Sequence, residues 1–352
     1  MKIFYGVQGT GNGHIARARA MALALKKRNV EVDFLFSGRD KNKYFSMESF
    51  GEYQTRSGLT FVSDNGKVNY FKSARETHLT ELMRDIRQLD LSGYDLVIND
   101  FEPISAWAAR KQKVPCLGLS HQNAFRYPIP LKGASWLDKQ IIERFAPADF
   151  HIGLHWYHFE QPILPPIVHT SSQDIASEAF ILVYLPFERL SVISELLFRF
   201  TNHTFVCYHP EVTDIESVEN IELRPLSHEC FQQDLHRCSG VMANGGFELP
   251  SEAMSLGKKL LLKPLDGQFE QQSNVATLEM LGLASSMDYL DASVVRNWLD
   301  EKQADRVVYP DVASAICDWL LQGNWNDQQQ LCQGLWRQVD FPSYALVGGL
   351  VN

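Results

Sequence analysis

The sequence has no long apolar run and no paired cysteine motif, and these absences exclude several classes of protein. Its strongly apolar runs, such as 181–183 and 260–262, are the size of single strands, whereas a membrane-spanning helix needs roughly 18 apolar residues in a row. The six cysteines include no Cys-x-x-Cys pair, which argues against a zinc ribbon, a thioredoxin-type site and a disulfide scaffold. We therefore expect no membrane span and reduced, mostly structural thiols.

An excess of positive charge is also lacking. The chain of 352 residues carries 33 Lys and Arg against 42 Asp and Glu, a formal net charge of −9. A field of this sign repels a phosphate backbone, so general binding to nucleic acid is not expected. The first eight residues lead directly into a glycine-rich stretch and show no apolar segment with a cleavage site. These features predict a cytoplasmic protein.

No convincing metal motif is present. His151, His155 and His158 have separations seen in metal sites, but their segment begins as a strand and offers no supporting carboxylate. Ordinary structural histidines are the simpler interpretation. We expect neither a metal site nor a bound cofactor.

Strand-like apolar runs alternate with helical patterns along the chain, and its length suffices for two domains because a single core stops growing at roughly 250–300 residues. Three prolines in 161–169 interrupt this alternation, which restarts with a strand at 180–185. The pattern predicts an α/β chain of two Rossmann-like domains, 1–163 and 164–326, with the segment 327–352 able to pack back onto the first domain. In the first domain we expect strands at 3–7, 30–36, 95–98, 115–119 and 149–154 and helices at 15–27, 73–89, 102–111 and 135–144.

A glycine loop follows the first strand and opens the first helix. It comprises Gly9, Gly11, Asn12 and Gly13 and allows a ligand to approach the backbone at a helix N-terminus. A dinucleotide fingerprint would need a sixth-position glycine where this sequence has His14. An NADP site that uses Arg39 stays open as a minor alternative.

His14 is the candidate general base. It stands at a helix N-terminus, where the helix dipole favours the neutral ring that can accept a proton. Asp100, at the end of a strand, could accept the second imidazole N–H and stabilise the charged ring. The alternatives are that His14 only caps or packs at the loop and that Asp100 is the N-cap of the helix at 102–111.

A second glycine motif is more informative. Gly245 and Gly246 lie between a strand and a helix, where backbone amides can hold a diphosphate without a metal. Glu252 lies about one turn into this helix, within reach of ribose hydroxyls. The candidate donor-binding residues are Gly245, Gly246, Glu248, Glu252, Glu270 and Gln271, and the alternative is that they form capping boxes and solvated helix starts.

Polar and aromatic residues on first-domain loops could face an acceptor. Tyr70 and Phe125 stand beside basic residues, which suits an acceptor wall or a shallow contact with a membrane surface. His121 follows a strand and is a reserve candidate for the base. Core-edge aromatics would explain Tyr70 and Phe125 equally well.

The Gly-x-Gly-x-Gly-His motif at 9–14, together with Asn-Gly-Gly and Glu-Ala at 244–253 and Phe-Glu-Gln at 269–271, resembles the GT-B glycosyltransferases. The sequence is most similar to the MJ-type hypothetical glycosyltransferases. It is more distantly similar to the lipid-linked N-acetylglucosaminyltransferase of peptidoglycan synthesis and to UDP-glucuronosyltransferases.

The resemblance implies two facing domains, a nucleotide-sugar donor on the second and an acceptor on the first, and metal-independent transfer with inversion. By motif, His14 would be the base, Gly245 and Gly246 the diphosphate loop, Glu252 the ribose ligand, and Glu270 and Gln271 the sugar contacts. The loop at 185–188, Leu-Pro-Phe-Glu, departs from relatives that carry Gly and Ser near the phosphates.

The sequence thus predicts a glycosyltransferase that moves a sugar from a nucleotide-sugar donor, preferably UDP-linked, to the hydroxyl of an unidentified acceptor: a lipid-linked molecule, a glycan or a small molecule. Contact with a membrane is expected to be peripheral at most. Two alternatives stay open. One is a nucleotide-sugar 2-epimerase, and the other is an NADP-dependent oxidoreductase or a silent nucleotide-binding module.

Overall fold

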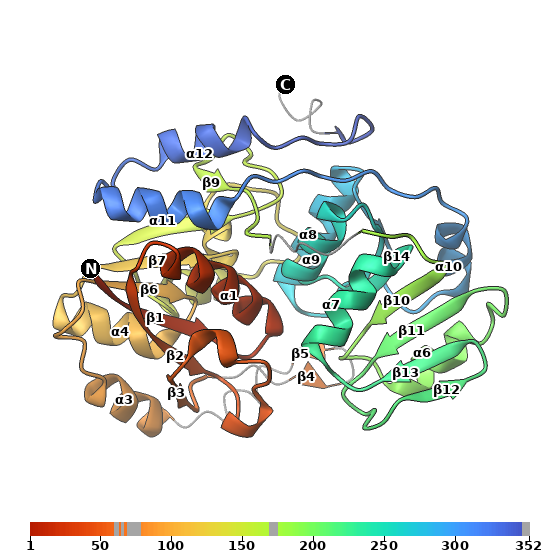
Figure 1. Cartoon of the computed structure of the whole chain (residues 1–352), viewed down its shortest axis with the longest axis horizontal. Coiled ribbons are helices and arrows are strands. Elements are labelled where there is room, and N and C mark those ends of the chain that lie inside the picture. Colours follow the sequence, from red (N-terminus) through yellow and green to blue (C-terminus); the bar gives the residue numbers. More distant parts are fainter. Residues whose placement is uncertain (60–62, 65–66, 69–78, 169–174, 347–352) are drawn as a thin grey trace.

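The computed structural model describes residues 1–59, 63–64, 67–68, 79–168 and 175–346. Two seven-stranded sheets form the centres of two α/β domains that lie side by side (Figure 1). The predicted fold class, two Rossmann-like domains, is confirmed by this arrangement. A short antiparallel hairpin of β4 (Ser63–Asp64) and β5 (Lys67–Val68) is separate from both sheets.

The first sheet is parallel throughout, with the strand order β3-β2-β1-β6-β7-β8-β9. Its central strands read as continuous apolar runs because helices cover both faces of the sheet. The strands are β1 (Lys2–Gln8), β2 (Glu31–Ser37), β3 (Tyr53–Arg56), β6 (Leu96–Asp100), β7 (Cys116–Ser120), β8 (Phe150–Leu154) and β9 (Ile163–Leu164). The helices of this domain are α1 (Asn12–Lys26), η1 (Lys41–Lys43), η2 (Glu48–Phe50), α3 (Leu79–Gln88), α4 (Pro103–Gln112), η3 (Gln122–Arg126) and α5 (Trp136–Arg144).

The second sheet has the order β12-β13-β11-β10-β14-β15-β16, in which only the β12–β13 pair is antiparallel among the described strands. Its strands are β10 (Phe180–Tyr184), β11 (Thr204–Tyr208), β12 (Glu216–Val218), β13 (Ile221–Arg224), β14 (Gly240–Asn244), β15 (Lys259–Lys263) and β16 (Ser285–Ser286). Its helices are α6 (Leu190–Leu197), α7 (His228–Arg237), α8 (Glu248–Ser255), α9 (Phe269–Met280) and α10 (Ala292–Leu299).

Local sequence explains where key helices begin. Ser135 and Asp138 form a capping box at the start of α5, as expected for a helix at 135–144. Helix α4 begins with Pro103, and its N-cap is Glu102, whose carboxylate accepts from the amides of Ile104 and Ser105 at 2.8 and 2.6 Å. The N-cap of this helix is therefore Glu102, which leaves Asp100 available for another partner.

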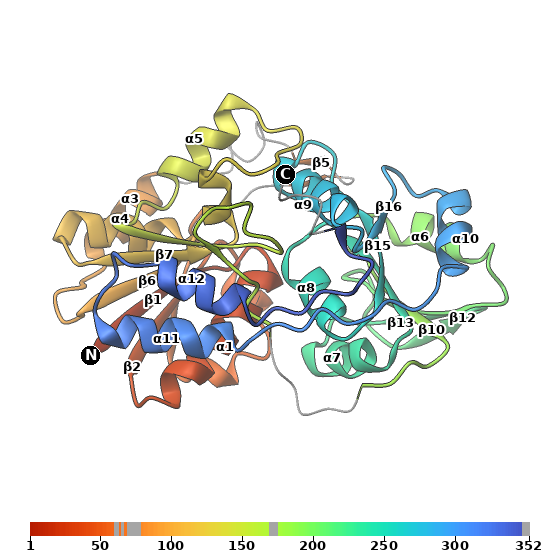
Figure 2. The ribbon, with the colours of Figure 1, turned by 90° about the horizontal axis from the view of Figure 1, so that it is seen from above.

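The last two helices, α11 (Val312–Gln322) and α12 (Gln329–Trp336), return to the first domain (Figures 1 and 2). Arg28, just beyond α1, donates from Nε and Nη2 to the two carboxylate oxygens of Asp318 in α11 at 2.6 and 2.7 Å. The indole of Trp336 donates to the carbonyl of Ile163 at 2.6 Å. Helix α11 falls within 164–326, the range predicted for the second domain, but it packs on α1 of the first domain.

The two domains also share a continuous apolar contact. The rings of Trp156, after β8, and Phe247, at the start of α8, lie 4.8 Å apart. The Trp156 indole donates to Ser251 Oγ of α8 at 2.8 Å. None of the described helices has both the length and the apolarity to cross a membrane.

Candidate functional site

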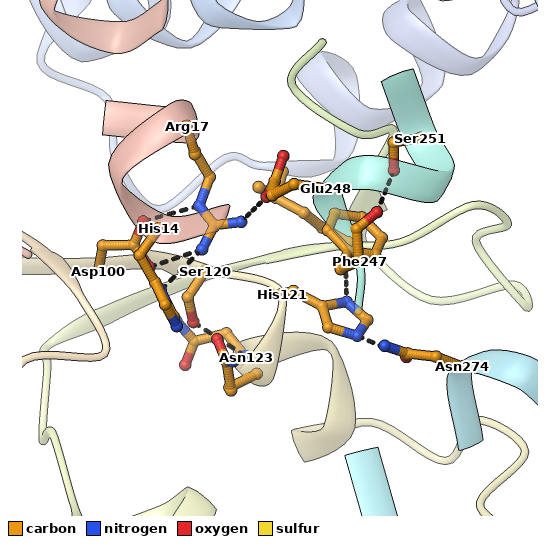
Figure 3. A network of polar contacts seen from close by, with 12 residues as sticks. His14, Arg17, Asp100, Ser120, His121, Asn123, Phe247, Glu248, Ser251 and Asn274 are labelled. Carbon is orange, nitrogen blue, oxygen red and sulfur yellow. Dashed lines mark hydrogen bonds and ion pairs between the residues drawn. The ribbon is translucent and has the colours of Figure 1, made fainter. Parts of the chain in front are cut away.

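His14 and Asp100 form the centre of the site. Parallel pairing places Asp100, the last residue of β6, opposite Val7 of β1, next to the glycine loop. The Nδ1 atom of His14, in the first turn of α1, lies 2.7 Å from Oδ1 of Asp100 (Figure 3). Asp100 is fully buried, and Arg17 and His14 hold its pKa below the ordinary value although burial opposes them. Because an ionised carboxylate can only accept, the hydrogen bond to Asp100 requires a proton on Nδ1 and leaves Nε2 without one; Nη2 of Arg17 also lies 3.0 Å from Nδ1.

Arg17 is part of this site, and the sequence analysis missed it. Its Nε and Nη2 atoms each donate to one oxygen of Asp100 at 2.7 Å, and Nη1 donates to Oε1 of Glu248 in the second domain. The side chain is only 2% exposed. A signal was present, since Arg17 stands three residues after His14 and therefore on the same face of the helix.

The first glycine loop brings the domains close together. A Cβ atom on Gly13 would lie 2.8 Å from Cγ of Glu248, so this position needs a glycine. Gly11 is the N-cap of α1, and no side chain caps this helix. Arg39 donates to Oδ1 of Asn12 at 3.0 Å and to the carbonyl of Thr10 at 3.2 Å. The guanidinium proposed for an NADP site thus holds the loop, which also includes Gly9.

The second glycine loop joins β14 to α8. The amide of Gly245 donates to Oε1 of Gln271 at 3.2 Å, and the amide of Gly246 donates to the carbonyl of Asn244 at 2.9 Å. Gln271 also accepts from the amide of Leu265 at 3.0 Å, so its side chain ties two loops together. No side chain caps α8 after these glycines, so the amides of Glu248 and Leu249 can bind an anion, whereas Pro250 has no N–H to offer.

Of the three carboxylates predicted to hold the donor, Glu248 binds Arg17 of the first domain, and the other two lie on either side of this loop. Glu252 accepts from Nε2 of Gln232 at 3.0 Å, and burial raises its pKa. Glu270, in the first turn of α9, accepts from Nε2 of Gln122 in the first domain at 3.2 Å. The structure therefore brings Glu252 to the side of the loop near α7 and Glu270 to the side near η3.

The acceptor-side residues have different surroundings. His121 is 1% exposed and stacks on Phe247 at 4.0 Å, with its Nδ1 2.8 Å from the carbonyl of Leu154 and its Nε2 2.7 Å from Oδ1 of Asn274. It is a buried contact between the domains, so its interpretation as a reserve base is wrong for this conformation, and burial lowers its pKa. Phe125 lies at a cavity described below, and Tyr70 lies outside the described residues.

The histidines considered for a metal are also packed. His155 is fully buried, and Nδ1 of His151 lies 3.1 Å from Oδ1 of Asn123. Within the part of the chain that the structure describes, no group of three or more His, Cys, Asp or Glu side chains is arranged to hold a metal ion.

A cavity of about 800 Å³ lies in the first domain between η3 and α5. Apolar side chains line it together with basic ones, and Trp136 of α5 is 74% exposed nearby. Figure 2 shows α5 at the rim of the first domain, on the side of α9. The lining consists of Phe125, Tyr127, Pro128, Ile129, Leu131 and Ile142, the basic residues Arg126, Lys139 and Arg144, and the acidic Glu143, so the basic side chains outnumber the acidic one.

Comparisons with known proteins identify the family and the fold of the chain. The family described as glycosyl transferase family 1 matches residues 1–302. No curated protein matches the sequence. Among solved structures, the glycotransferase of kitacinnamycin is 14% identical with a TM-score of 0.59, and the alignment covers 96% of this chain and 99% of that one.

Two further solved structures are similar in fold. Acinetobacter baumannii MurG is 13% identical with a TM-score of 0.54, covering 91% of this chain and 99% of that one. Arabidopsis thaliana UGT89C1, complexed with UDP, is 12% identical with a TM-score of 0.54, covering 95% and 99%. The matches support sugar transfer and give no support to the epimerase or oxidoreductase alternatives. The chain belongs to glycosyl transferase family 1 and is a glycosyltransferase with the two-domain GT-B fold.

Proposed function

We propose that this glycosyltransferase uses His14 as a general base to move a sugar from a UDP-linked donor to an acceptor hydroxyl, without a metal and with inversion. The observation that carries the proposal is the 2.7 Å contact between His14 and Asp100. Asp100 orients the ring and stabilises the imidazolium that forms when Nε2 takes a proton. His14 remains 13% exposed, whereas His121 is 1% exposed, so His14 is the better base of the two.

The proposed reaction is a single displacement. As the acceptor O–H bond breaks, its proton passes to Nε2 of His14 and the oxygen forms a bond to C1 of the sugar. The bond from C1 to the diphosphate oxygen breaks on the opposite side, and the electron pair leaves with UDP. This geometry inverts the configuration at C1.

The donor is proposed to bind against α8 and α9. The uncapped first turn of α8, which follows Gly245 and Gly246, would face the diphosphate, where its amides oppose the negative charge that develops on the leaving group. We expect Glu252 to bind the ribose hydroxyls, and Glu270 and Gln271, in the first turn of α9, to contact the sugar. We favour UDP as the nucleotide of the donor because UGT89C1, which is similar in fold, was solved in complex with UDP.

The acceptor is proposed to lie on the first domain, with an apolar portion in the cavity between η3 and α5. Phe125, Ile129 and Ile142 offer apolar contacts, whereas Lys139 and Arg144 favour an anionic group. An amphiphilic acceptor, such as a lipid-linked molecule, combines both features. The exposed Trp136 and Leu137 would then touch the surface of a membrane peripherally.

Calorimetry tests the donor part of this proposal. The purified protein is titrated, without added metal, with UDP, UDP-N-acetylglucosamine, TDP, GDP and NADPH. Saturable binding of UDP or of a UDP-sugar is the expected result. Binding of NADPH alone would contradict the proposal and move the ligand site to the first glycine loop.

A further inference from the structure

Arg17 joins the two domains at the base. Its Nε and Nη2 atoms bind both oxygens of Asp100 in β6, and its Nη1 atom binds Glu248, the first residue of α8 (Figure 3). Asp100 belongs to the first domain and Glu248 to the second. A single buried guanidinium therefore connects the partner of His14 to the first helix turn of α8 in the second domain.

Arg17 fixes the carboxylate that orients His14. Oδ1 of Asp100 accepts from both Nη2 of Arg17 and Nδ1 of His14, each at 2.7 Å. A bidentate pair sets the plane of a carboxylate because two parallel bonds must be satisfied together. The direction in which His14 presents Nε2 thus depends on where Arg17 is held.

Glu248 completes the position of Arg17. A guanidinium that is 2% exposed has to satisfy its N–H groups inside the protein, and Glu248 accepts from Nη1. The side chain of Glu248 is also packed against the first turn of α1, where a Cβ at Gly13 would lie 2.8 Å from its Cγ. Separation of the domains would remove both contacts and leave Nη1 without its partner.

We propose that Arg17 is a positioning residue for His14 and Asp100, and that Glu248 holds it in place only while the two domains are closed. The base is then oriented when the second domain, with its donor, lies against the first. An open enzyme would not activate a hydroxyl, and the closed cleft would limit hydrolysis of the donor by water. The inference rests on the proposed function only for the role of His14 as the base.

The first experiment does not require activity. Histidine labelled with ¹³C at Cε1 reports each ring by NMR, and the His14 signal is the one of eleven that His14→Gln removes. We expect Glu248→Ala and Arg17→Lys to shift or broaden this signal. A lysine cannot form two parallel bonds to Asp100. Glu248→Gln, whose amide oxygen still accepts from Nη1, should leave the signal close to its original position.

Ser251→Ala is the matched control. Ser251 lies on the same helix as Glu248, accepts from the Trp156 indole of the first domain at 2.8 Å and donates to the carbonyl of Phe247 at 2.7 Å, so its hydrogen bonds do not involve Arg17. The substitution Ser251→Ala removes a hydrogen bond between the domains and leaves the contacts of Arg17 in place, so the His14 signal should not move. If Glu248→Ala does not fold, Glu248→Asp serves in its place, because its shorter side chain also withdraws the acceptor.

Kinetics separates a positioning role from a donor-binding or purely structural one. We expect Glu248→Ala to lower kcat by about 10- to 100-fold with the Kd for UDP changed less than about twofold. Glu248→Gln should recover the larger part of this loss. If Glu248 contacts the donor, its substitution would instead raise the Kd and the KM. If its role is purely structural, Glu248→Gln and Glu248→Ala would both lower the unfolding temperature, and their kcat values would not differ.

The inference is overturned if Glu248→Ala leaves the His14 signal where the wild-type protein has it, or if Ser251→Ala moves it equally. Failure of the proposed function looks different. In that case no UDP-sugar binds to the wild-type protein, while the response of the His14 signal still decides whether Arg17 positions the ring.

Discussion

Nδ1 of His14 lies 2.7 Å from Oδ1 of Asp100 although 86 positions separate the two residues in the chain. Neighbouring parallel strands β1 and β6 end at the same edge of the sheet, and this brings the loop after one strand next to the last residue of the other. The imidazole ring and the carboxylate are thus assembled at the edge where open α/β sheets bind ligands.

Removal of the base should slow transfer strongly while the donor still binds. We expect His14→Ala to lower kcat by roughly 100-fold or more, because positioned proton transfer contributes on that scale. The Kd for UDP, measured by calorimetry, should change by less than about twofold. His203→Ala, in the second domain away from the two glycine loops, is the control; an equal loss of UDP affinity in His14→Ala would reject the assigned role.

Glu252 should act on donor affinity. Its partly buried carboxylate lies one turn beyond the start of α8, so Glu252→Ala is expected to weaken UDP binding by about tenfold or more, the loss of one or two charge-assisted hydrogen bonds. The measurement is the Kd for UDP, with the exposed Glu195→Ala as control. A variant that loses kcat but keeps its UDP affinity would show that Glu252 does not hold the ribose.

Glu248 should make stability depend on pH. Burial raises its pKa to about 8, against the opposing charge of Arg17, whereas an unfolded glutamate titrates near 4.3. Between these two values the folded state holds a proton that the unfolded state releases. The contribution of Glu248 to the free energy of unfolding is therefore complete below about pH 4 and is lost as the pH rises through about 8.

Urea unfolding at pH 5, 7 and 9 checks this pH dependence. The free energy of unfolding of the wild-type protein, relative to that of Glu248→Gln, should fall across this range by an amount on the order of 1–3 kcal/mol. Glutamine cannot ionise, so Glu248→Gln serves as the reference for the wild-type protein at every pH. Parallel curves for the two proteins would mean that Glu248 does not titrate in this range.

Chelation should not affect transfer. If the amides at the start of α8 oppose the charge of the leaving diphosphate, the rate in the presence of EDTA should stay within about twofold of the untreated rate. Added Mg²⁺ or Mn²⁺ should not raise it further. Loss of activity on chelation, with recovery on addition of one of these ions, would assign that charge to a metal.

The face around α5 should bind anionic lipid weakly. Trp136 is 74% exposed beside a cavity that Lys139 and Arg144 line. We expect partial co-sedimentation with vesicles that contain phosphatidylglycerol, weakened by Trp136→Ser and by salt, because both apolar contact and charge contribute. Glu195→Ala is again the control, and equal sedimentation with neutral vesicles in high salt would argue against this surface.

The sequence by itself determined the fold class and part of the site. Alternating apolar runs and helical patterns predicted both sheets, because local propensity and hydrophobic period act over short stretches of chain. The glycine loops and the His14 position could be recognised for the same reason. The start of α4 also followed local rules, although the capping residue is Glu102 and Asp100 contacts His14 instead.

Only the tertiary structure decided which side chains meet. The sequence analysis did not identify Arg17, yet this residue binds Asp100 and Glu248, the latter 231 positions away. His121 was a candidate acceptor-side residue because it follows a strand, but stacking on Phe247 buries it between the domains. Helix α11 likewise packs on α1 of the first domain. Partner choice of this kind depends on how two complete domains approach each other, and that approach is fixed by the summed burial and pairing of many distant residues rather than by any local pattern.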